Sequence, residues 1–171
     1  MVNRVLYPGR FQPFHLGHLN VVEDLFRKFD EVVIAIGSAQ EGFTCRNPFT
    51  AGERMEMIRE TLLAVGVDPT RLWLIPVPDL NKPLAWTSYL LGLSPSVKAV
   101  ATGNPHVAYL YKWLGLKVIN IKPYNPEIYN GSNIRMLIAK GLEWEHCVHS
   151  ITATYIKKIG GVERIRTLCS S

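Results

Sequence analysis

The chain has 171 residues, of which 47% are hydrophobic and 19% are charged, a composition typical of a globular protein and not of a disordered chain. This length fits a single domain, residues 1–171, that can bury a core. The net charge is +5, but apart from two pairs within residues 157–166 the cations are scattered, which favours a small anionic ligand over a nucleic acid. We expect neither a signal peptide nor a membrane span, because charges interrupt the N-terminal segment and the longest uncharged stretch, residues 83–97, is too short.

The three cysteines, Cys45, Cys147 and Cys169, are odd in number and widely spaced along the chain. This spacing predicts neither a disulfide framework nor a zinc site. It is typical of a protein in a reducing compartment, so we expect a cytoplasmic location.

Strands and helices are predicted to alternate along the first part of the chain. In order, we expect a strand at 2–8, a helix at 18–29, a strand at 31–38, a helix at 50–65, a strand at 72–77, a helix at 84–93, a strand at 97–101, a helix at 106–114 and a strand at 117–121. The continuous apolar run at 32–36 is typical of a central parallel strand that is buried on both faces. A helix that starts at Ser132 is expected next, followed by a helical segment from about residue 142 onward.

This alternation predicts an α/β fold, a doubly wound (Rossmann-like) parallel sheet of about five strands with helices on both faces and a helical C-terminal segment. Ligands of such sheets bind beyond the carboxyl ends of the strands. The loops that follow the predicted strands are therefore expected to gather at one edge; they are residues 9–15, 37–49, 78–86 and 102–106.

The segment from Tyr7 to His18 joins the first strand to the first helix and is the strongest candidate for a ligand site. Its two glycines and two prolines predict a rigid turn. His15 and His18 are three residues apart, so both project from one face near the helix N-terminus, where backbone N–H groups and the macrodipole favour an anion. Arg10 adds a cation, and phosphate is the expected ligand.

A second candidate for phosphate binding is the segment at residues 129–135, with Ser132 as the predicted N-cap. Arg135 then lies in the first helical turn, where the macrodipole disfavours a cation. A bound polyphosphate would reverse that sign, and an exposed arginine that tolerates the small cost is the alternative. The sequence contains neither Gly-x-Gly-x-x-Gly nor Gly-Lys-Ser/Thr, which argues against a dehydrogenase and against a P-loop enzyme.

The first segment resembles the His-x-Gly-His signature of the nucleotidyltransferase superfamily in its Gly-x-Phe-x-Pro-x-His-x-Gly-His form. Residues 130–135 resemble the Ser-x-Thr-x-x-Arg motif that accompanies it, with Asn130 and Ser132 in place of the usual Ser and Thr. Further segments extend the resemblance: the residues on either side of Arg46, the segment Gly103-Asn104-Pro105 and residues 161–165. With them, nearly the whole chain resembles the archaeal type of nicotinamide-nucleotide adenylyltransferase.

This resemblance implies transfer of the adenylyl group of ATP to the 5′-phosphate of nicotinamide mononucleotide (NMN), which forms NAD and pyrophosphate. The implied catalytic residues are His15, His18, Arg10, Arg46 and Arg135. The implied ATP-binding residues are Gly9, Arg10, Phe11, His15, His18, Asn130, Ser132 and Arg135. The implied NMN-binding residues are Gly37, Ser38, Arg46, Asp79, Leu80, Trp86 and Asn104.

A tryptophan in the third strand-to-helix connection stacks on the nicotinamide ring in that family, and Trp86 stands at the matching place. The alternative for Trp86 is a core residue. Pro83 replaces an Asn that relatives often carry, so backbone groups around Leu80 and Asn81 are expected to bind the amide.

No carboxylate cluster offers a metal cage, so we expect no dedicated metal site and a Mg²⁺ ion, or another divalent ion, that arrives with ATP. The expected partners are ATP, NMN and the product NAD, with no nucleic acid and no membrane. The resemblance also implies a homo-oligomer, as hexamers occur among such relatives. Alternatives are a transferase of the same superfamily that uses flavin mononucleotide or phosphopantetheine as acceptor, and a non-catalytic nucleotide sensor.

Overall fold

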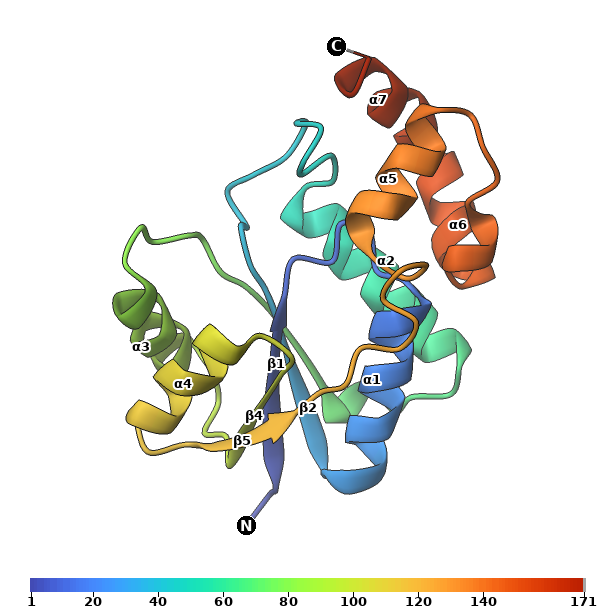
Figure 1. Cartoon of the computed structure of the whole chain (residues 1–171). Coiled ribbons are helices and arrows are strands. Elements are labelled where there is room, and N and C mark those ends of the chain that lie inside the picture. The colour runs from blue at the N-terminus through green and yellow to red at the C-terminus, as the bar shows by residue number, and fades with distance from the viewer. Residues whose placement is uncertain (171) are drawn as a thin grey trace.

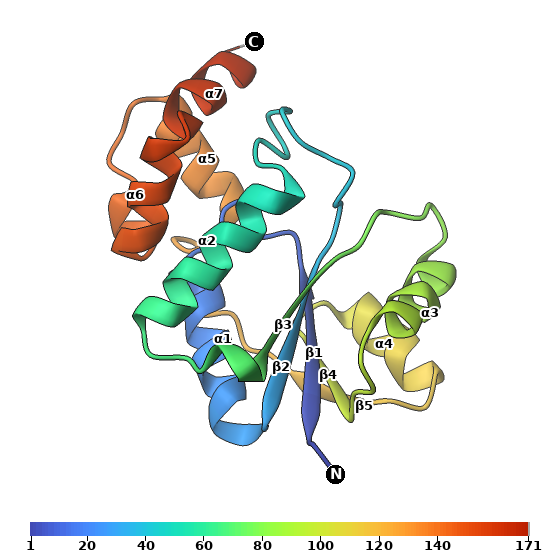
Figure 2. The same ribbon diagram turned by 180° about the vertical axis from the view of Figure 1, so that it is seen from behind.

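The computed structural model describes residues 1–170 and contains a sheet of five parallel strands in the order β3-β2-β1-β4-β5 (Figures 1 and 2). The strands are β1 (Arg4–Gly9), β2 (Glu31–Ile36), β3 (Leu72–Pro76), β4 (Ala99–Thr102) and β5 (Lys117–Asn120). The helices are α1 (Leu16–Lys28), α2 (Ala51–Ala64), α3 (Pro83–Leu93), α4 (Pro105–Trp113), α5 (Gly131–Ala139), α6 (Ser150–Lys158) and α7 (Gly161–Leu168). The predicted doubly wound α/β fold is confirmed, and its strand order reverses between β1 and β4, where such sheets bind ligands.

Helices cover both faces of the sheet, with α1 and α2 on one face and α3 and α4 on the other (Figures 1 and 2). Leu19 of α1 and Ile58 of α2 share one core with Val5 of β1, whereas Leu90 of α3 shares a second core with Leu6. Adjacent residues of a strand point to opposite faces, which is why Val5 and Leu6 belong to different cores. All residues of β2 after Glu31 are buried, as predicted for a central strand.

The three C-terminal helices form a third core against α2 (Figure 2). Met57 of α2 packs there with Ile134 of α5, Ile156 of α6 and Ile165 of α7. Phe49, which precedes α2, belongs to the same core, so this unit extends to the segment that enters α2. Among the helices of residues 1–170, none is both long and apolar enough to cross a membrane.

Helices α1 and α5 begin earlier than predicted, and their N-caps show where each of them starts. α1 begins at Leu16 with His15 as its N-cap. α5 begins at Gly131 because Asn130 is the N-cap, and its Oδ1 accepts the Asn133 N–H at 2.7 Å. The predicted N-cap Ser132 is therefore wrong, and Arg135 lies just beyond the first turn of α5.

The expectation that the cysteines form no disulfide is also wrong. Cys45 and Cys169, 124 residues apart in sequence, are bonded to each other with their Cα atoms 5.0 Å apart, while Cys147 is free and buried. Sequence spacing carries no information about this pair, because the packing of α7 on the rest of the chain brings the two residues together. The bond also removes the cysteine-based argument for a reducing compartment.

Candidate active site

The turn between β1 and α1 is held in place by its own side chains. Phe11 is buried at φ 54°, and a Cβ atom at Gly9 would lie only 2.7 Å from the Phe11 ring. Gln12 donates from Nε2 to the Phe49 carbonyl at 2.8 Å and accepts the Phe49 N–H at 3.0 Å, which ties the turn to the segment before α2. Phe11 supports the site from the core side, with its ring centroid 4.7 Å from that of His18.

His15 and His18 form a reciprocal capping box at the N-terminus of α1. The Nδ1 atom of each ring accepts the backbone N–H of the other residue at 3.3 Å, and the rings stack with their centroids 3.6 Å apart. Burial lowers the pKa of His15 to about 4, and burial together with the charge of His15 lowers the pKa of His18 well below its usual range. Both rings are therefore neutral near pH 7 with the proton on Nε2, so each offers an N–H donor.

A cavity of about 290 Å³ lies in front of this histidine pair. Its walls include both histidines, Gly9, Asn104 and two tyrosines, Tyr124 and Tyr129. The tyrosine rings stack in parallel with their centroids 5.5 Å apart, a surface suited to a flat heterocycle. The sequence interpretation missed this pair, and its signal is two aromatic residues in the connection that follows β5.

A second cavity, of about 530 Å³, lies on the other side of the end of β1. Most of the predicted NMN-binding residues line this cavity, and two predicted ATP-binding residues, Gly9 and Arg10, line it with them. The NMN-binding residues in its wall are Gly37, Ser38, Arg46, Asp79, Trp86 and Asn104. Gly9 and Asn104 line both cavities, so the two spaces meet at the carboxyl ends of β1 and β4.

Trp86 is half-buried in the wall of the second cavity, and its Nε1 donates to the Pro78 carbonyl at 3.1 Å. It also lines an adjoining cavity of about 310 Å³ with Leu80 and Pro83. Leu80 is therefore placed beside the second cavity and not in it. Part of Trp86 packs on the core between the sheet and α3 and α4, and another part lines the cavities, so stacking on a ligand ring stays a prediction for this residue.

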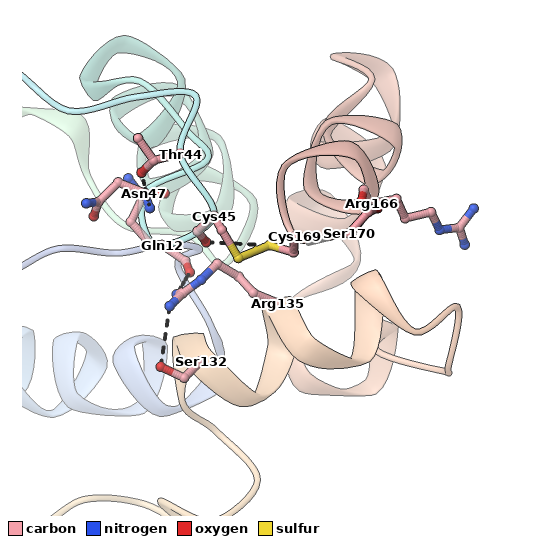
Figure 3. The surroundings of a disulfide bond; sticks show 9 residues. All are labelled: Gln12, Thr44, Cys45, Asn47, Ser132, Arg135, Arg166, Cys169 and Ser170. Atoms are coloured by element: carbon pink, nitrogen blue, oxygen red, sulfur yellow. Dashed lines mark hydrogen bonds between the residues drawn. A yellow bond between two sulfur atoms is a disulfide. The ribbon is translucent and has the colours of Figure 1, made fainter.

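Arg135 is buried, and it donates from Nη1 to the Gln12 carbonyl at 2.7 Å and from Nη2 to Ser132 Oγ at 3.3 Å (Figure 3). Together with Arg46 and Ser132 it lines a third cavity of about 540 Å³. Arg46 lines both this cavity and the second one, so it connects them. Asn130, the remaining predicted ATP-binding residue, is used as a helix cap and lies outside the residues that line these three cavities.

The arginines create a positive potential around the cavities. Burial, followed by the charges of Arg10 and Arg46, lowers the pKa of Arg135 to about 10. Burial and the charge of Arg46 also lower the pKa of Arg10, whereas the carboxylate of Asp79 acts in the opposite direction. Three guanidinium groups close to one carboxylate favour a bound polyanion.

Arg54 of α2 is a further cation that the sequence interpretation missed. Its side chain is fully buried and donates to three carbonyls of other segments, those of Arg10 at 2.8 Å, Gly37 at 2.7 Å and Ser38 at 3.0 Å. It also donates from Nε to the carbonyl of the helix cap Thr50 at 3.2 Å. It therefore fixes the ends of β1 and β2 relative to α2. The only sequence signal is its place directly after Glu53 in a capping box, and only the structure shows that the side chain points inward.

Carboxylates are sparse at the site, and residues 1–170 contain no group of three or more His, Cys, Asp or Glu side chains that could hold a metal ion. Asp79 is the acidic residue among those that line the second cavity. A divalent ion in this site would therefore depend on phosphate oxygens for most of its ligands.

Residues 6–79, which run from β1 to the segment after β3 and include the histidine pair, match the family model described as cytidylyltransferase-like. The chain is 44% identical over 167 residues to the nicotinamide-nucleotide adenylyltransferase of Saccharolobus solfataricus, which covers 98% of this chain and 97% of that protein. It is 44% identical over 168 residues to the enzyme of the same name from Pyrococcus horikoshii, covering 98% of this chain and 90% of the relative. The chain belongs to the nicotinamide-nucleotide adenylyltransferase family.

Solved structures support the same fold. A bifunctional NMN adenylyltransferase/ADP ribose pyrophosphatase from Francisella tularensis superposes with a TM-score of 0.85 at 22% identity and covers 99% of this chain. The same protein complexed with AMP and a manganese ion superposes with a TM-score of 0.83 at 22% identity and also covers 99% of this chain. The chain spans about half the length of these two structures, 53% and 52% respectively.

Proposed function

We propose that this chain transfers the adenylyl group of ATP to the 5′-phosphate of nicotinamide mononucleotide, forming NAD and pyrophosphate. The observation that carries the proposal is the pair of cavities that meet at the ends of β1 and β4, one with a neutral histidine pair and the other with Trp86 and two arginines. Two substrates bound on either side of this junction would bring a phosphate of each to the same place. Family membership supports the choice of NMN as acceptor.

Catalysis in this proposal depends on positioning and charge, because the attacking phosphate is already an anion and needs no strong base. His18 donates from Nε2 to the α-phosphate as negative charge builds in the transition state, and His15 holds the transferring and bridging oxygens. Neutral rings suit this role, since their donors are present at every pH above the range where the rings titrate. The Nδ1 hydrogen bonds of the capping box keep both donors pointed away from the helix.

The arginines are proposed to share the phosphates. Arg10 and Arg135 clamp the β- and γ-phosphates of ATP, and Arg46 holds the NMN phosphate or the leaving pyrophosphate. The position of Arg46 between the second and third cavities supports either role. On the acceptor side, Trp86 stacks on the nicotinamide ring, and backbone groups near Leu80 contact the amide.

Mg²⁺ is the proposed metal, brought to the site by ATP. A structural neighbour crystallised with AMP and manganese supports the use of a divalent ion. The sparse carboxylates fit a metal held mainly by phosphates, and Asp79 is the acidic side chain in the wall of the second cavity. The ion would neutralise phosphate charge, and the arginines of this chain would hold the same oxygens in place.

A homo-oligomer, and in particular a hexamer, is proposed as the assembly. α3 is largely apolar all round, yet its residues Leu84, Tyr89 and Leu93 are exposed, as are Tyr109 and Trp113 of α4. Helices that are apolar all round are usually covered, so this face supports contact with a second copy. Light scattering of the Trp113→Asp variant tests it, with a smaller particle expected than for the unchanged chain.

The function is tested by pyrophosphate release from ATP across a panel of acceptors: NMN, nicotinic acid mononucleotide, flavin mononucleotide and phosphopantetheine. We expect release with NMN, and a rate with another acceptor but none with NMN would refute the proposal. His18→Ala should lower kcat by roughly 10²–10³ while ATP still binds. His149→Ala is the matched control, because His149 caps α6 away from the cavities and its loss should leave kcat unchanged.

A further inference from the structure

Arg46 lies in residues 39–49, a segment between β2 and α2 that forms neither helix nor strand. The end of this segment is well anchored, since residues 47–49 are buried and Arg164 of α7 donates to a carbonyl within them at 3.1 Å. Residues 43–46, in contrast, are exposed. Arg46 therefore lies on the exposed part of the segment, in a turn closed by a hydrogen bond from the Thr44 N–H to the Asn47 carbonyl at 3.2 Å. This bond holds the backbone of the turn and leaves its link to the rest of the fold to other contacts.

The Cys45–Cys169 disulfide provides a covalent restraint at the residue before Arg46 (Figure 3). Cys169 is the residue that ends α7, and the Cα atoms of the two cysteines are 5.0 Å apart. α7 is itself fixed to α2, because Arg164 forms a half-buried salt bridge with Glu53 at 2.6 Å. The disulfide thus attaches the exposed part of the segment to a well-packed part of the fold.

The disulfide also lies in the wall of the phosphate site. Both cysteines line the third cavity, together with Arg46 and Arg135. α7 is joined to α5, which carries Arg135, through a hydrogen bond from Arg166 Nε to a carbonyl of α5 at 3.3 Å. The Cys45–Cys169 bond therefore limits how far Arg46, on the loop, can lie from Arg135, on α5.

Repulsion between the guanidinium groups of Arg46, Arg135 and Arg10 acts to separate them when no bound anion neutralises their charge. The charges of Arg10 and Arg46 both lower the pKa of Arg135, which places the three cations within mutual range. Within residues 1–170 the Arg46 side chain has no hydrogen bond or salt bridge that would hold it there. Repulsion between like charges then favours an outward movement of Arg46, and the bond at Cys45 resists that movement.

We propose that the Cys45–Cys169 disulfide is a positioning crosslink that holds Arg46 at the phosphate site, so that its reduction weakens substrate binding. This inference rests on the proposed adenylyl transfer. The crosslink forms when the two thiols pass two electrons to a small disulfide compound and release two protons to the two thiols that this compound yields. A dithiol reverses the step and is itself converted to a disulfide.

The test compares steady-state kinetics of the oxidised chain with those of the chain reduced by dithiothreitol. We expect reduction to raise KM for the substrate phosphate that Arg46 contacts by about 10-fold, which corresponds to about 1.4 kcal/mol, with kcat changed less. Cys45→Ser should match the reduced chain and should not respond to dithiothreitol. Cys147→Ser removes the free cysteine and should respond as the unchanged chain does.

Two outcomes would overturn the proposal directly. One is a thiol titration of the unfolded chain, prepared without reductant, that detects three free thiols instead of one, because the disulfide would then be absent. The other is a KM that stays the same after reduction even though the thiol count has risen to three, which would make the bond a stabilising crosslink alone.

A double-mutant cycle tests whether the crosslink acts through Arg46. The Arg46→Ala variant should have a raised KM that reduction changes little, and an undiminished response to reduction in this variant would contradict the proposal. Calorimetry with pyrophosphate separates this inference from the proposed function. If the oxidised chain does not act on NMN, the proposed function fails, whereas a pyrophosphate affinity that falls on reduction still supports the crosslink.

Discussion

Replacement of Arg54 by methionine tests how the turn after β1 and the loop after β2 are held. The side chain of Arg54 is fully buried, and it donates to the carbonyls of Arg10, Gly37 and Ser38 at 2.7–3.0 Å. Burial is the main reason that its pKa falls to about 10, so the folded chain pays a desolvation cost that these carbonyls must offset. Methionine keeps much of the volume and removes every donor.

The magnitude follows from these three hydrogen bonds. Each hydrogen bond to a charged group contributes about 1.5–3 kcal/mol to the free energy of unfolding. Removal of the guanidinium also removes the desolvation cost of a buried charge, so we expect the free energy of unfolding to fall by about 3 kcal/mol in all. For a chain of this size this lowers Tm by about 6–12 °C. Because the carbonyls belong to residues of the second cavity, KM for NMN should also rise by about 10-fold at a temperature where the variant is folded.

Thermal unfolding and initial-rate kinetics measure the two effects separately. Arg59→Met is the matched control, because Arg59 lies on the same helix with an exposed side chain and its replacement should leave both Tm and KM nearly unchanged. Arg54→Lys should recover only part of the loss, since an ammonium group cannot reproduce the planar fork of a guanidinium. A normal KM for NMN in the folded Arg54→Met chain would refute the positioning role.

Further predictions concern the turn, the second motif and the acceptor pocket. In NMR titrations His15 should stay neutral through pH 6.5 and titrate near pH 4. Because the unfolded chain binds that proton near pH 6.5, the stability linked to His15 is complete above pH 6.5 and is lost as the pH falls toward 4. A His15 titration near pH 6.5 would contradict the burial argument. Gly131→Ala places a Cβ 2.9 Å from Arg135 Nη1 and should lower the free energy of unfolding, measured by chemical denaturation, by about 1–3 kcal/mol. Gly52→Ala lies on an open helix surface and should raise the same free energy by about 0.5–1 kcal/mol. Trp86→Ala should raise KM for NMN about 10-fold in steady-state assays, with phenylalanine at this position recovering most of the affinity, and an unchanged KM would exclude stacking.

Local patterns in the sequence predicted the order and type of the elements well. The apolar run of β2 indicated a strand buried on both faces, and the helix predicted at 50–65 is α2, which begins at Ala51 with Thr50 as its N-cap. Turn residues and helix caps act over a few residues, so the chain around them is enough to infer them. The same holds for the turn before α1, although the reciprocal use of His15 and His18 as caps moved the helix start to Leu16.

Contacts between distant segments decided the rest. Arg54 is an ordinary helix residue in the sequence, and its role depends on three carbonyls from other segments. Cys45 and Cys169 form a bond only because α7 packs beside the loop that carries Arg46. Such pairings depend on the packed positions of whole helices, to which residue spacing gives no access.

The sequence by itself therefore determined the alternation of strands and helices and the chemical character of the first turn, since both are set by neighbours along the chain. Only the tertiary structure decided that this turn has a cavity on each side and that Phe11 and Arg54 pack against it from the core. It also decided that a disulfide joins Cys45, the residue before Arg46, to Cys169. The physical reason is that burial and charge at the site arise from the summed contacts of segments far apart in sequence. Tyr124 and Tyr129 illustrate this, because they meet the histidine pair only when β5 pairs with β4 at the edge of the sheet.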